Sequence, residues 1–130
     1  MQKDSPIIFL VDDQGIANFI NKKLIEVSSI SDDVYDFTNP LDALDAIKEI
    51  NPDLILLDLN MPEMTGWEFL NRMRTIESTS KVAICTSSTS AFDKERMKEY
   101  ADVVIDYCEK PLSREAIQKV TSIIKIGPAH

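Results

Sequence analysis

Apolar and polar residues alternate along the chain in blocks of two kinds. Short unbroken apolar runs, typical of strands buried on both faces of a parallel sheet, occupy residues 7–11, 54–57, 82–85 and 103–105. A run with polar interruptions at residues 33–37 predicts a more exposed strand at the edge of the sheet. Between these runs, apolar residues recur every three or four positions, which is the spacing of amphipathic helices.

The periodic segments predict five helices. The second would begin at Asn39-Pro40, with Asn as N-cap and Pro at the first helical position, and the last would follow Ser113 as its cap. The fourth, at about residues 91–100, has the weakest pattern. The apolar stripes of the five predicted helices are, in chain order, Ile16, Ile20, Leu24 and Val27; Leu41, Leu44, Ile47 and Ile50; Trp67, Leu70, Met73 and Ile76; Phe92 and Met97; and Ala116, Ile117, Val120, Ile123 and Ile124.

Strands that alternate with helices form parallel sheets covered by helices on both faces. A chain of 130 residues is long enough for one such hydrophobic core and too short for two. We therefore expect a single α/β domain over residues 1–130, with a core at about residues 6–126, built as a doubly wound five-stranded parallel sheet.

Charge and composition narrow the function classes. The formal net charge of −8 disfavours direct binding to nucleic acid, because the phosphates would be repelled, and leaves cations and basic protein surfaces as partners. No apolar run approaches the roughly 20 residues of a membrane span, and the amino end lacks the basic and apolar regions of a secretory signal. We therefore expect a cytoplasmic protein without membrane insertion. Cys85 and Cys108 lie in apolar, strand-like stretches and are expected to be buried thiols.

Charged and hydroxyl side chains stand where the predicted strands end. Asp12 and Asp13 follow the first strand, Asp58 the third and Thr86 the fourth, and Lys110 comes shortly after the fifth. The carboxyl ends of parallel strands meet at the edge where ligands bind in open α/β sheets, so we expect these five residues at one rim. Three carboxylates in one place repel one another and suit a divalent cation. Oxygen ligands without His or Cys favour magnesium over zinc.

The same residues fit phosphoryl chemistry. A carboxylate such as Asp58 can be a nucleophile that forms an aspartyl phosphate, and phosphoryl transfer mainly needs in-line positioning and cancellation of oxygen charge. A metal, Lys110 and the Thr86 hydroxyl would supply that cancellation. Each residue also has a plainer explanation. Asp12 and Asp13 could be acids that stabilise a helix N-terminus, Lys110 a solvated surface lysine, and Thr86 a cap at the end of a strand. Their coincidence at one predicted rim favours a site.

Over nearly its full length the chain resembles the receiver domain of two-component response regulators, in particular the stand-alone receivers of chemotaxis type. The resemblance rests on Val11-Asp12-Asp13, Asp58 followed by Leu-Asn-Met-Pro-Glu-Met-Thr-Gly, Thr86-Ser87-Ser88, Tyr107, and Lys110-Pro111. It implies a flavodoxin-like fold with five helices and strand order 2-1-3-4-5.

The resemblance also implies roles for the acids. Asp58 would be the phosphoacceptor. Magnesium would be held by Asp58, by Asp12 or Asp13, and by the backbone carbonyl of Asn60, with Asp13 as the more direct of the two neighbouring ligands.

Further roles are implied around the phosphoryl group. Lys110 would contact it, aimed by a peptide bond to Pro111 that is often cis in this family. Thr86 and Tyr107 would form a switch pair that transmits the change. The positions that vary within the family and tune the lifetime of the phosphoryl group are Asn60 and Ser88.

By this resemblance the chain would be a signalling module rather than an enzyme with a separate substrate. It would take a phosphoryl group from a histidine kinase or a histidine phosphotransfer protein and lose it by hydrolysis. Since the chain stops after the fifth predicted helix, we expect no output domain, and the output would be an unidentified downstream protein. A phosphorylation-dependent dimer is also compatible with the family.

Two other classes use related parts. Magnesium-dependent phosphatases with an Asp nucleophile typically carry it after the first strand, with a second Asp two residues later; here Asn60 stands two residues after Asp58, and no cap domain would enclose a substrate. A flavin carrier would have its phosphate loop after the first strand, where this chain has Asp12 and Asp13. Turnover of a generic phosphate ester would distinguish a phosphatase from a receiver.

Overall fold

The computed structural model describes residues 5–87 and 90–126. Five parallel strands form one sheet in the order β2-β1-β3-β4-β5, which confirms the expected fold class and strand order. The elements along the chain are β1 (Ile7–Val11), α1 (Gly15–Val27), β2 (Asp33–Phe37), α2 (Pro40–Ile50), β3 (Leu54–Leu57), α3 (Gly66–Thr75), β4 (Lys81–Thr86), α4 (Ala91–Met97), the short 3₁₀ helix η1 (Lys98–Tyr100), β5 (Val104–Glu109) and α5 (Arg114–Ile126).

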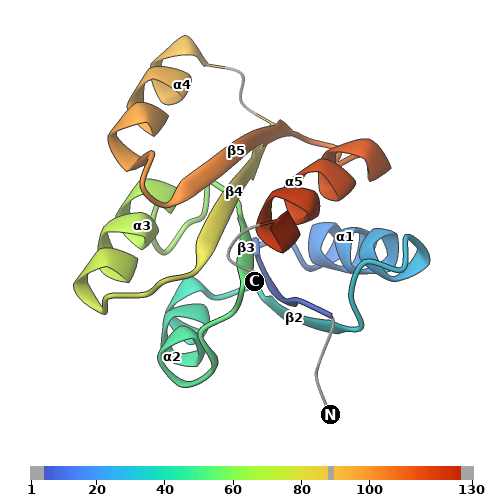
Figure 1. The fold of residues 1–130 in the computed structure, drawn as a ribbon. Helices are drawn as coiled ribbons and strands as arrows, with labels where there is room; N and C mark the ends of the chain where they lie inside the picture. Colours follow the sequence, from blue (N-terminus) through green and yellow to red (C-terminus); the bar gives the residue numbers. More distant parts are fainter. Residues whose placement is uncertain (1–4, 88–89, 127–130) are drawn as a thin grey trace.

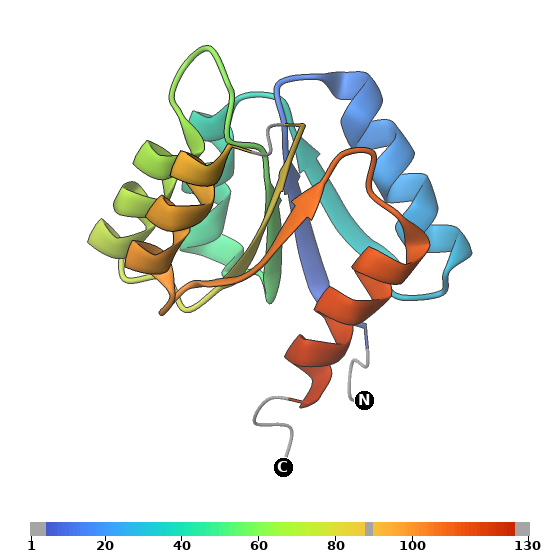
Figure 2. The same cartoon turned by 90° about the horizontal axis from the view of Figure 1, so that it is seen from above.

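Helices cover both faces of the sheet (Figures 1 and 2). The blue α1 and the red α5 lie on one face, and α2, α3 and α4 lie on the other. Successive strand residues point to opposite faces, so each strand contributes to two separate cores. One core holds Phe9, Ile55, Val82, Phe69 and Met73, among others. The second, which we call the α1/α5 core, includes Ile8, Leu56, Ile25, Ile117, Val120, Cys85 and Cys108.

The edges of the sheet follow the sequence pattern in part. The polar-interrupted β2 lies at one edge, as expected, while the wholly buried β3 is central. β5 forms the other edge and is longer than the predicted run at residues 103–105, so Tyr107 lies within the strand rather than after it. Asp106 breaks the apolar pattern there, and the pairing of β4 with β5 shifts register between Val82 and Ala83.

Side-chain caps define where helices begin. The Asn39 side chain accepts a hydrogen bond from the Leu41 amide at 2.9 Å, and Pro40 occupies the first turn. The Ser113 hydroxyl accepts one from the Ala116 amide at 3.0 Å. Both caps were predicted from the sequence. α4 and η1 together occupy the segment predicted as the fourth helix.

The apolar stripe predicted for the first helix is wrong. Ile16, Ile20 and Val27 are each more than half exposed, as is Phe19 beside them. The buried face of α1 is instead formed around Asn18 and Ile25. The helix turns its polar Asn18 inward because the side chain makes hydrogen bonds at the end of the sheet, which leaves an apolar stripe on the outer surface.

Smaller corrections apply to the ends of other predicted stripes. Leu44 and Ile47 are buried in α2, but Leu41 and Ile50, near the two ends of the helix, are exposed. Ile123 on α5 is exposed, and Phe92 on the short α4 is the most exposed of the large apolar residues described.

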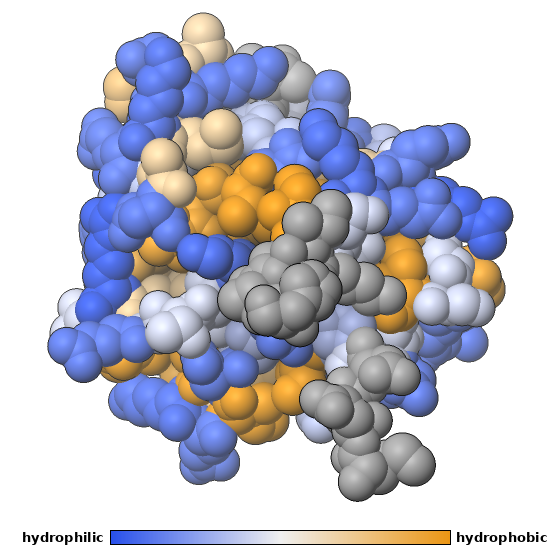
Figure 3. Space-filling view, in the orientation of Figure 1, coloured by the Kyte–Doolittle hydropathy of each residue, from blue (hydrophilic) through white to orange (hydrophobic). Residues whose placement is uncertain are grey.

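The surface carries separate apolar patches. Figure 3 shows a mostly hydrophilic face on which apolar residues gather in patches divided by hydrophilic ones. Among residues 5–87 and 90–126, no helix combines the length and apolar character needed to cross a membrane.

Candidate functional site

Three carboxylates meet at the carboxyl ends of two neighbouring strands. Asp12 and Asp13 follow β1, and Asp58 follows β3. One carboxylate oxygen from each of the three lies within 4.8 Å of the others, with Asp12 and Asp58 buried and Asp13 half-buried. A compact group of oxygen donors that opens to solvent fits a hard divalent cation such as magnesium. The clustering predicted from the sequence is therefore present.

Backbone hydrogen bonds continue the sheet into these loops. The Asp58 amide donates to the Val11 carbonyl at 3.0 Å, and the Asp12 amide donates to the Phe37 carbonyl at 3.1 Å. The last hydrogen bonds of the sheet thus fix the backbone of Asp12 and of Asp58.

Asn18 supports the β1–α1 loop from inside and was not anticipated from the sequence. Its Nδ2 donates to the backbone carbonyls of Asp12 and Phe37, both at 3.1 Å. The Gln14 amide donates to Oδ1 of Asp12 at 2.9 Å. A polar residue among the apolar positions of the first helix was the available signal, but helical period alone does not reveal which side faces the sheet.

Lys110 places its positive charge among the acids. Its Nζ lies 2.5 Å from Oδ2 of Asp12 and 3.6 Å from Oδ1 of Asp58. The Lys110 amide donates to the Thr86 carbonyl at 2.8 Å, which extends the pairing of β4 and β5 by one residue. The Lys110–Pro111 peptide bond is cis, as the family resemblance implied.

The electrostatics of the cluster follow from burial and charge. Burial raises the pKa of Asp58 above its ordinary value of 3.8, assisted by the charges of Asp12 and Asp13 and opposed by Lys110 and by the backbone amide of Asn60. For Lys110, burial opposes the charge, but the hydrogen bond to Asp12 and the attraction of Asp58 outweigh it and raise its pKa. The cluster is therefore short of positive charge in the absence of a cation.

Gly66 allows the loop after β3 to fold back against the first turn of α3. Its amide donates to the Leu59 carbonyl at 2.8 Å. A Cβ atom at this position would lie 2.9 Å from the Asp58 carbonyl oxygen and from Leu59 Cα. Only glycine fits such a close approach to backbone, so the residue fixes the path of the chain beside Asp58.

Thr86 and Tyr107 lie on neighbouring strands, as expected. Thr86 is the fully buried last residue of β4. Tyr107 is half-buried, pairs in register with Ile84, and lies beneath the Lys94 ammonium of α4, 5.9 Å from the ring centroid. Burial and the nearby charges of Asp93 and Glu109 raise the pKa of Tyr107. Thr86 thus lies at the end of β4, and Tyr107 on the neighbouring strand lies against α4.

The two predicted lifetime positions have different outcomes. Asn60 is exposed at the mouth of the cluster, where its backbone reaches Asp58. Ser88 lies outside the residues that the structure describes.

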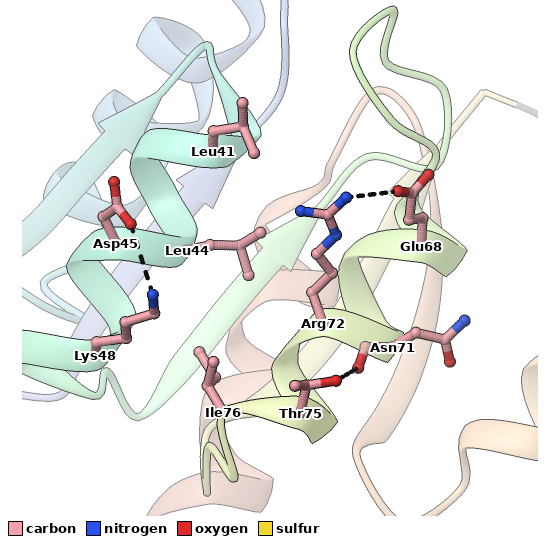
Figure 4. Close-up of a pocket in the computed structure, with 9 residues that line it drawn as sticks. All are labelled: Leu41, Leu44, Asp45, Lys48, Glu68, Asn71, Arg72, Thr75 and Ile76. Atoms are coloured by element: carbon pink, nitrogen blue, oxygen red, sulfur yellow. Dashed lines mark hydrogen bonds and ion pairs between the residues drawn. The ribbon is translucent and has the colours of Figure 1, made fainter.

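A hollow of about 610 Å³ lies elsewhere, between α2 and α3. In Figure 4, Leu44 and Ile76 point into this space. The charges around it are paired locally, Lys48 with Asp45 at 3.9 Å and Arg72 with Glu68 at 3.0 Å. None of the acids of the cluster lines it, and its charges are already paired, so the acidic cluster is the better candidate site.

Comparison with known proteins identifies the family to which this chain is similar. The model of the response regulator receiver domain matches residues 8–122. The chain is 35% identical over 117 residues to two-component response regulator 24 of Arabidopsis thaliana, covering 88% of this chain and 78% of that protein. It is 33% identical over 120 residues to the cyclic di-GMP phosphodiesterase response regulator RpfG of Xanthomonas campestris pv. campestris, covering 92% of this chain but only 32% of RpfG. The chain thus spans about a third of that relative's length.

Solved structures agree with this assignment. A two component response regulator from Cytophaga hutchinsonii superposes with a TM-score of 0.83 at 25% identity, covering 94% of this chain and 98% of that chain. The chemotaxis protein CheY4 of Vibrio cholerae has the same fold, with a TM-score of 0.77 at 24% identity over 92% of this chain and 98% of that chain. The matched range of residues 8–122 covers most of the chain and spans the acidic cluster, and the chain therefore belongs to the receiver domains of two-component response regulators.

Proposed function

We propose that the domain accepts a phosphoryl group on Asp58, with magnesium bound beside it, and signals through a surface that changes on phosphorylation. The observation that carries this proposal is the meeting of Asp12, Asp13 and Asp58 within 4.8 Å, with Lys110 3.6 Å from Asp58. An acid, a cation site and a fixed positive charge are the parts that phosphoryl transfer requires.

Asp58 is the nucleophile in this proposal. One of its carboxylate oxygens attacks the phosphorus of a phosphohistidine, the phosphorus–nitrogen bond breaks, and the imidazole leaves. The backbone hydrogen bond from Asp58 to β1 holds Asp58 in place, so little orientational freedom remains to be lost when it reacts.

The cation site would be formed by Asp12, Asp13, Asp58 and the carbonyl of Asn60, with Asp13 as the more exposed ligand of the neighbouring pair. Bound magnesium would neutralise charge on the transferred oxygens. Because Asp12 already accepts hydrogen bonds from Lys110 and Gln14, Asp13 is better placed for direct contact with the cation.

Lys110 and Thr86 complete the charge balance. The ammonium of Lys110 is close enough to Asp58 to reach a phosphoryl oxygen on it after a small movement. The Thr86 hydroxyl, at the end of the adjacent strand β4, would donate to a second oxygen.

The proposed donor is a histidine kinase or a histidine phosphotransfer protein, and we place its contact on α1. The exposed stripe of Ile16, Phe19 and Ile20 starts three residues after Asp13, beside the site. Contiguous exposed apolar side chains commonly mark protein contacts. The net charge of −8 favours a partner with a basic surface.

The proposed output face is formed by α4, β5 and α5, and its partner is a further protein or a second copy of the domain. Tyr107 lies in β5 and contacts Lys94 of α4, so its reorientation would alter this face. Such an element is biased by a local charge change, with a coupling of about 1–3 kcal/mol.

Labelling with a small acyl phosphate tests the function directly. With magnesium, intact mass should rise by about 80 Da, the mass of an added phosphoryl group, and the added group should be lost on incubation. Asp58→Asn and excess chelator should each abolish the gain, whereas Asp53→Asn, an acid at the opposite end of β3, should leave it unchanged.

Two outcomes would contradict the proposal. Labelling that persists in Asp58→Asn would move the phosphoacceptor elsewhere. Multiple turnover of a generic phosphate ester would favour the phosphatase class over a receiver.

A further inference from the structure

The two cysteines of the chain face each other across β4 and β5. Cys85 and Cys108 are register partners in these neighbouring parallel strands. Both belong to the α1/α5 core, so their side chains leave the sheet on the same face. The sequence places them 23 positions apart, and only the strand pairing reveals that they are adjacent.

Their spacing is compatible with a covalent bond. Neighbouring strands lie about 4.8 Å apart, and disulfides join residues whose Cα atoms are usually about 4.4–6.8 Å apart. Both cysteines are thiols in the structure. A bond between them would therefore need no large movement of the backbone.

The thiols already interact. Their mutual hydrogen bond raises the pKa of Cys85, and burial raises it further. The same hydrogen bond lowers the pKa of Cys108, against the opposing effects of burial and of Asp106, with Lys119 assisting. Cys108 is therefore the thiol that ionises more readily, and thiolates are the reactive form.

The two thiols are almost equally buried, and Cys108 is the one on the edge strand. It lies in β5, an edge strand, two residues before Lys110 and close to the rim of the sheet. Cys108 is 6% exposed and Cys85 is 4% exposed, so a large reagent is excluded from both. A peroxide, which is little larger than water, is the oxidant that this setting favours.

We propose that Cys85 and Cys108 form a reversible dithiol–disulfide pair that is oxidised by hydrogen peroxide. Cys108 attacks one peroxide oxygen, the oxygen–oxygen bond breaks, and a sulfenic acid and one water form. The Cys85 sulfur then attacks the sulfenic sulfur, the disulfide forms and a second water leaves. The two thiols lose two electrons and two protons in total, which reduce one peroxide to two waters, and a small dithiol reductant reverses the reaction.

The position of the pair gives the bond a consequence. Cys85 directly precedes Thr86, and Cys108 directly follows Tyr107. A disulfide would tie β4 to β5 beside both members of the proposed switch. If the proposed function holds, on which this consequence rests, oxidation would restrict the movement of Tyr107 while Asp58 remained able to accept a phosphoryl group.

The experiment begins with the reduced, full chain and a small excess of hydrogen peroxide. Intact mass should fall by about 2 Da, the two hydrogens lost on disulfide formation, and both cysteines should resist alkylation after denaturation until a reductant is added. Since the chain has two cysteines, a monomer with this mass carries the Cys85–Cys108 bond. Cys85→Ala and Cys108→Ala should each show no such loss.

Other products would overturn the proposal. Two fully alkylatable thiols after oxidation, disulfide-linked dimers alone, or oxygen added to a cysteine, seen as about 16 or 32 Da on a peptide that contains Cys85 or Cys108, would each exclude a pair that closes within the monomer. These products are measured on the wild-type chain. The test therefore remains decisive even if the alanine variants fail to fold.

Phosphoryl labelling separates this inference from the proposed function. Two results together would support both the disulfide and the proposed function. Asp58 would be labelled in the reduced and in the oxidised chain, and oxidation would lower the mass by about 2 Da, the signature of a disulfide. A disulfide without any labelling would leave the pair standing and refute the proposed function. Labelling without a disulfide would do the reverse.

Discussion

Lys110 donates its side-chain hydrogen bond to Asp12, at 2.5 Å, while its ammonium stays 3.6 Å from Asp58. The lysine that resemblance assigns to the phosphoryl group thus rests on a proposed metal ligand. Its charge would therefore compete with a bound cation for Asp12.

Replacing Lys110 should therefore separate two properties. In Lys110→Gln, labelling of Asp58 by acyl phosphate should slow by roughly 100-fold, the loss typical of removing one charge-stabilising donor. Magnesium should bind more tightly, by several-fold, because its competitor is gone. Titration calorimetry measures magnesium binding and intact mass measures labelling. Lys48→Gln, which replaces an exposed lysine of α2, is the control. Weaker magnesium binding in Lys110→Gln would show that the lysine organises the cation site rather than competing for it.

Asp58 gives a prediction for the pH dependence of stability. Burial raises its pKa above 3.8 in the folded chain, so the folded state binds this proton more tightly than the unfolded state does. Its contribution to stability is present below the unfolded pKa and is lost as pH rises through the folded pKa. In chelator at about pH 7, Asp58→Asn should therefore melt a few degrees higher than wild type.

The same comparison has a built-in check. At about pH 3.5, where the unfolded carboxyl is mostly protonated, the advantage of Asp58→Asn should vanish. Saturating magnesium should reduce or reverse it, because the variant loses a ligand and the cation stabilises the folded wild type. An equal difference at both pH values would show that charge is not its cause.

Gly66 and Gly15 form a matched pair for substitution by alanine. A Cβ atom at Gly66 would meet backbone at 2.9 Å, whereas at Gly15 its nearest neighbour is Thr38 Cγ2 at 3.9 Å. Gly66→Ala should cost about 1–3 kcal/mol in unfolding free energy, as overpacking does, and slow labelling by moving Asp58. Gly15→Ala should be neutral or stabilising by up to about 1 kcal/mol. Denaturant unfolding measures both, and equal effects would refute the close approach at Gly66.

The exposed stripe on α1 predicts a difference between phosphoryl donors. Phe19→Ala should slow transfer from a phosphohistidine protein that labels the wild type by roughly 10-fold, equivalent to about 1.4 kcal/mol of lost contact. Labelling by acyl phosphate, which needs no docking, should be unchanged. Leu41→Ala removes an exposed apolar side chain from α2 and should affect neither reaction. Equal slowing with both donors would place Phe19 in the chemistry or the fold rather than in docking.

The proposed switch pair of Thr86 and Tyr107 predicts which residues change their amide chemical shifts when a phosphoryl mimic binds. On addition of beryllofluoride and magnesium, amide shifts should extend to residues 91–107 and the start of α5, and should shrink there in Thr86→Ala. The reason is the path from the rim through Tyr107 to Lys94 of α4. Changes that stay near Asp13, Asp58 and Lys110 would show that this face is not the output.

The sequence predicted the positions of residues that are set by local structure or by strand order, and it did not predict those that depend on the path of a loop. Asp12 and Asp58 were placed correctly because each directly follows an unbroken apolar strand, and parallel strands end at one edge. The caps at Asn39 and Ser113 are local and were also predictable. The choice of Lys110 between two acids was not, because it depends on the path of the loop after β5.

The first helix shows why pattern alone fails. Its apolar residues outnumber the places that the α1/α5 core offers it, and a buried polar side chain has value only where backbone groups need partners. Asn18 meets that need for the carbonyls of Asp12 and Phe37. That requirement exists only in the folded chain, where β1 and β2 end side by side.

The bond between Lys110 and Asp12 joins residues 98 positions apart. During synthesis, the three acids are therefore made long before Lys110, which supplies the positive charge beside them. β4 is likewise made before β5, the strand that pairs with its outer edge. A growing chain therefore carries Asp58, the proposed phosphoacceptor, before it has the lysine that would assist its reaction. If the proposed function holds, only a chain translated past β5 and folded as a unit would accept the phosphoryl group efficiently, so signalling would depend on completion of the domain.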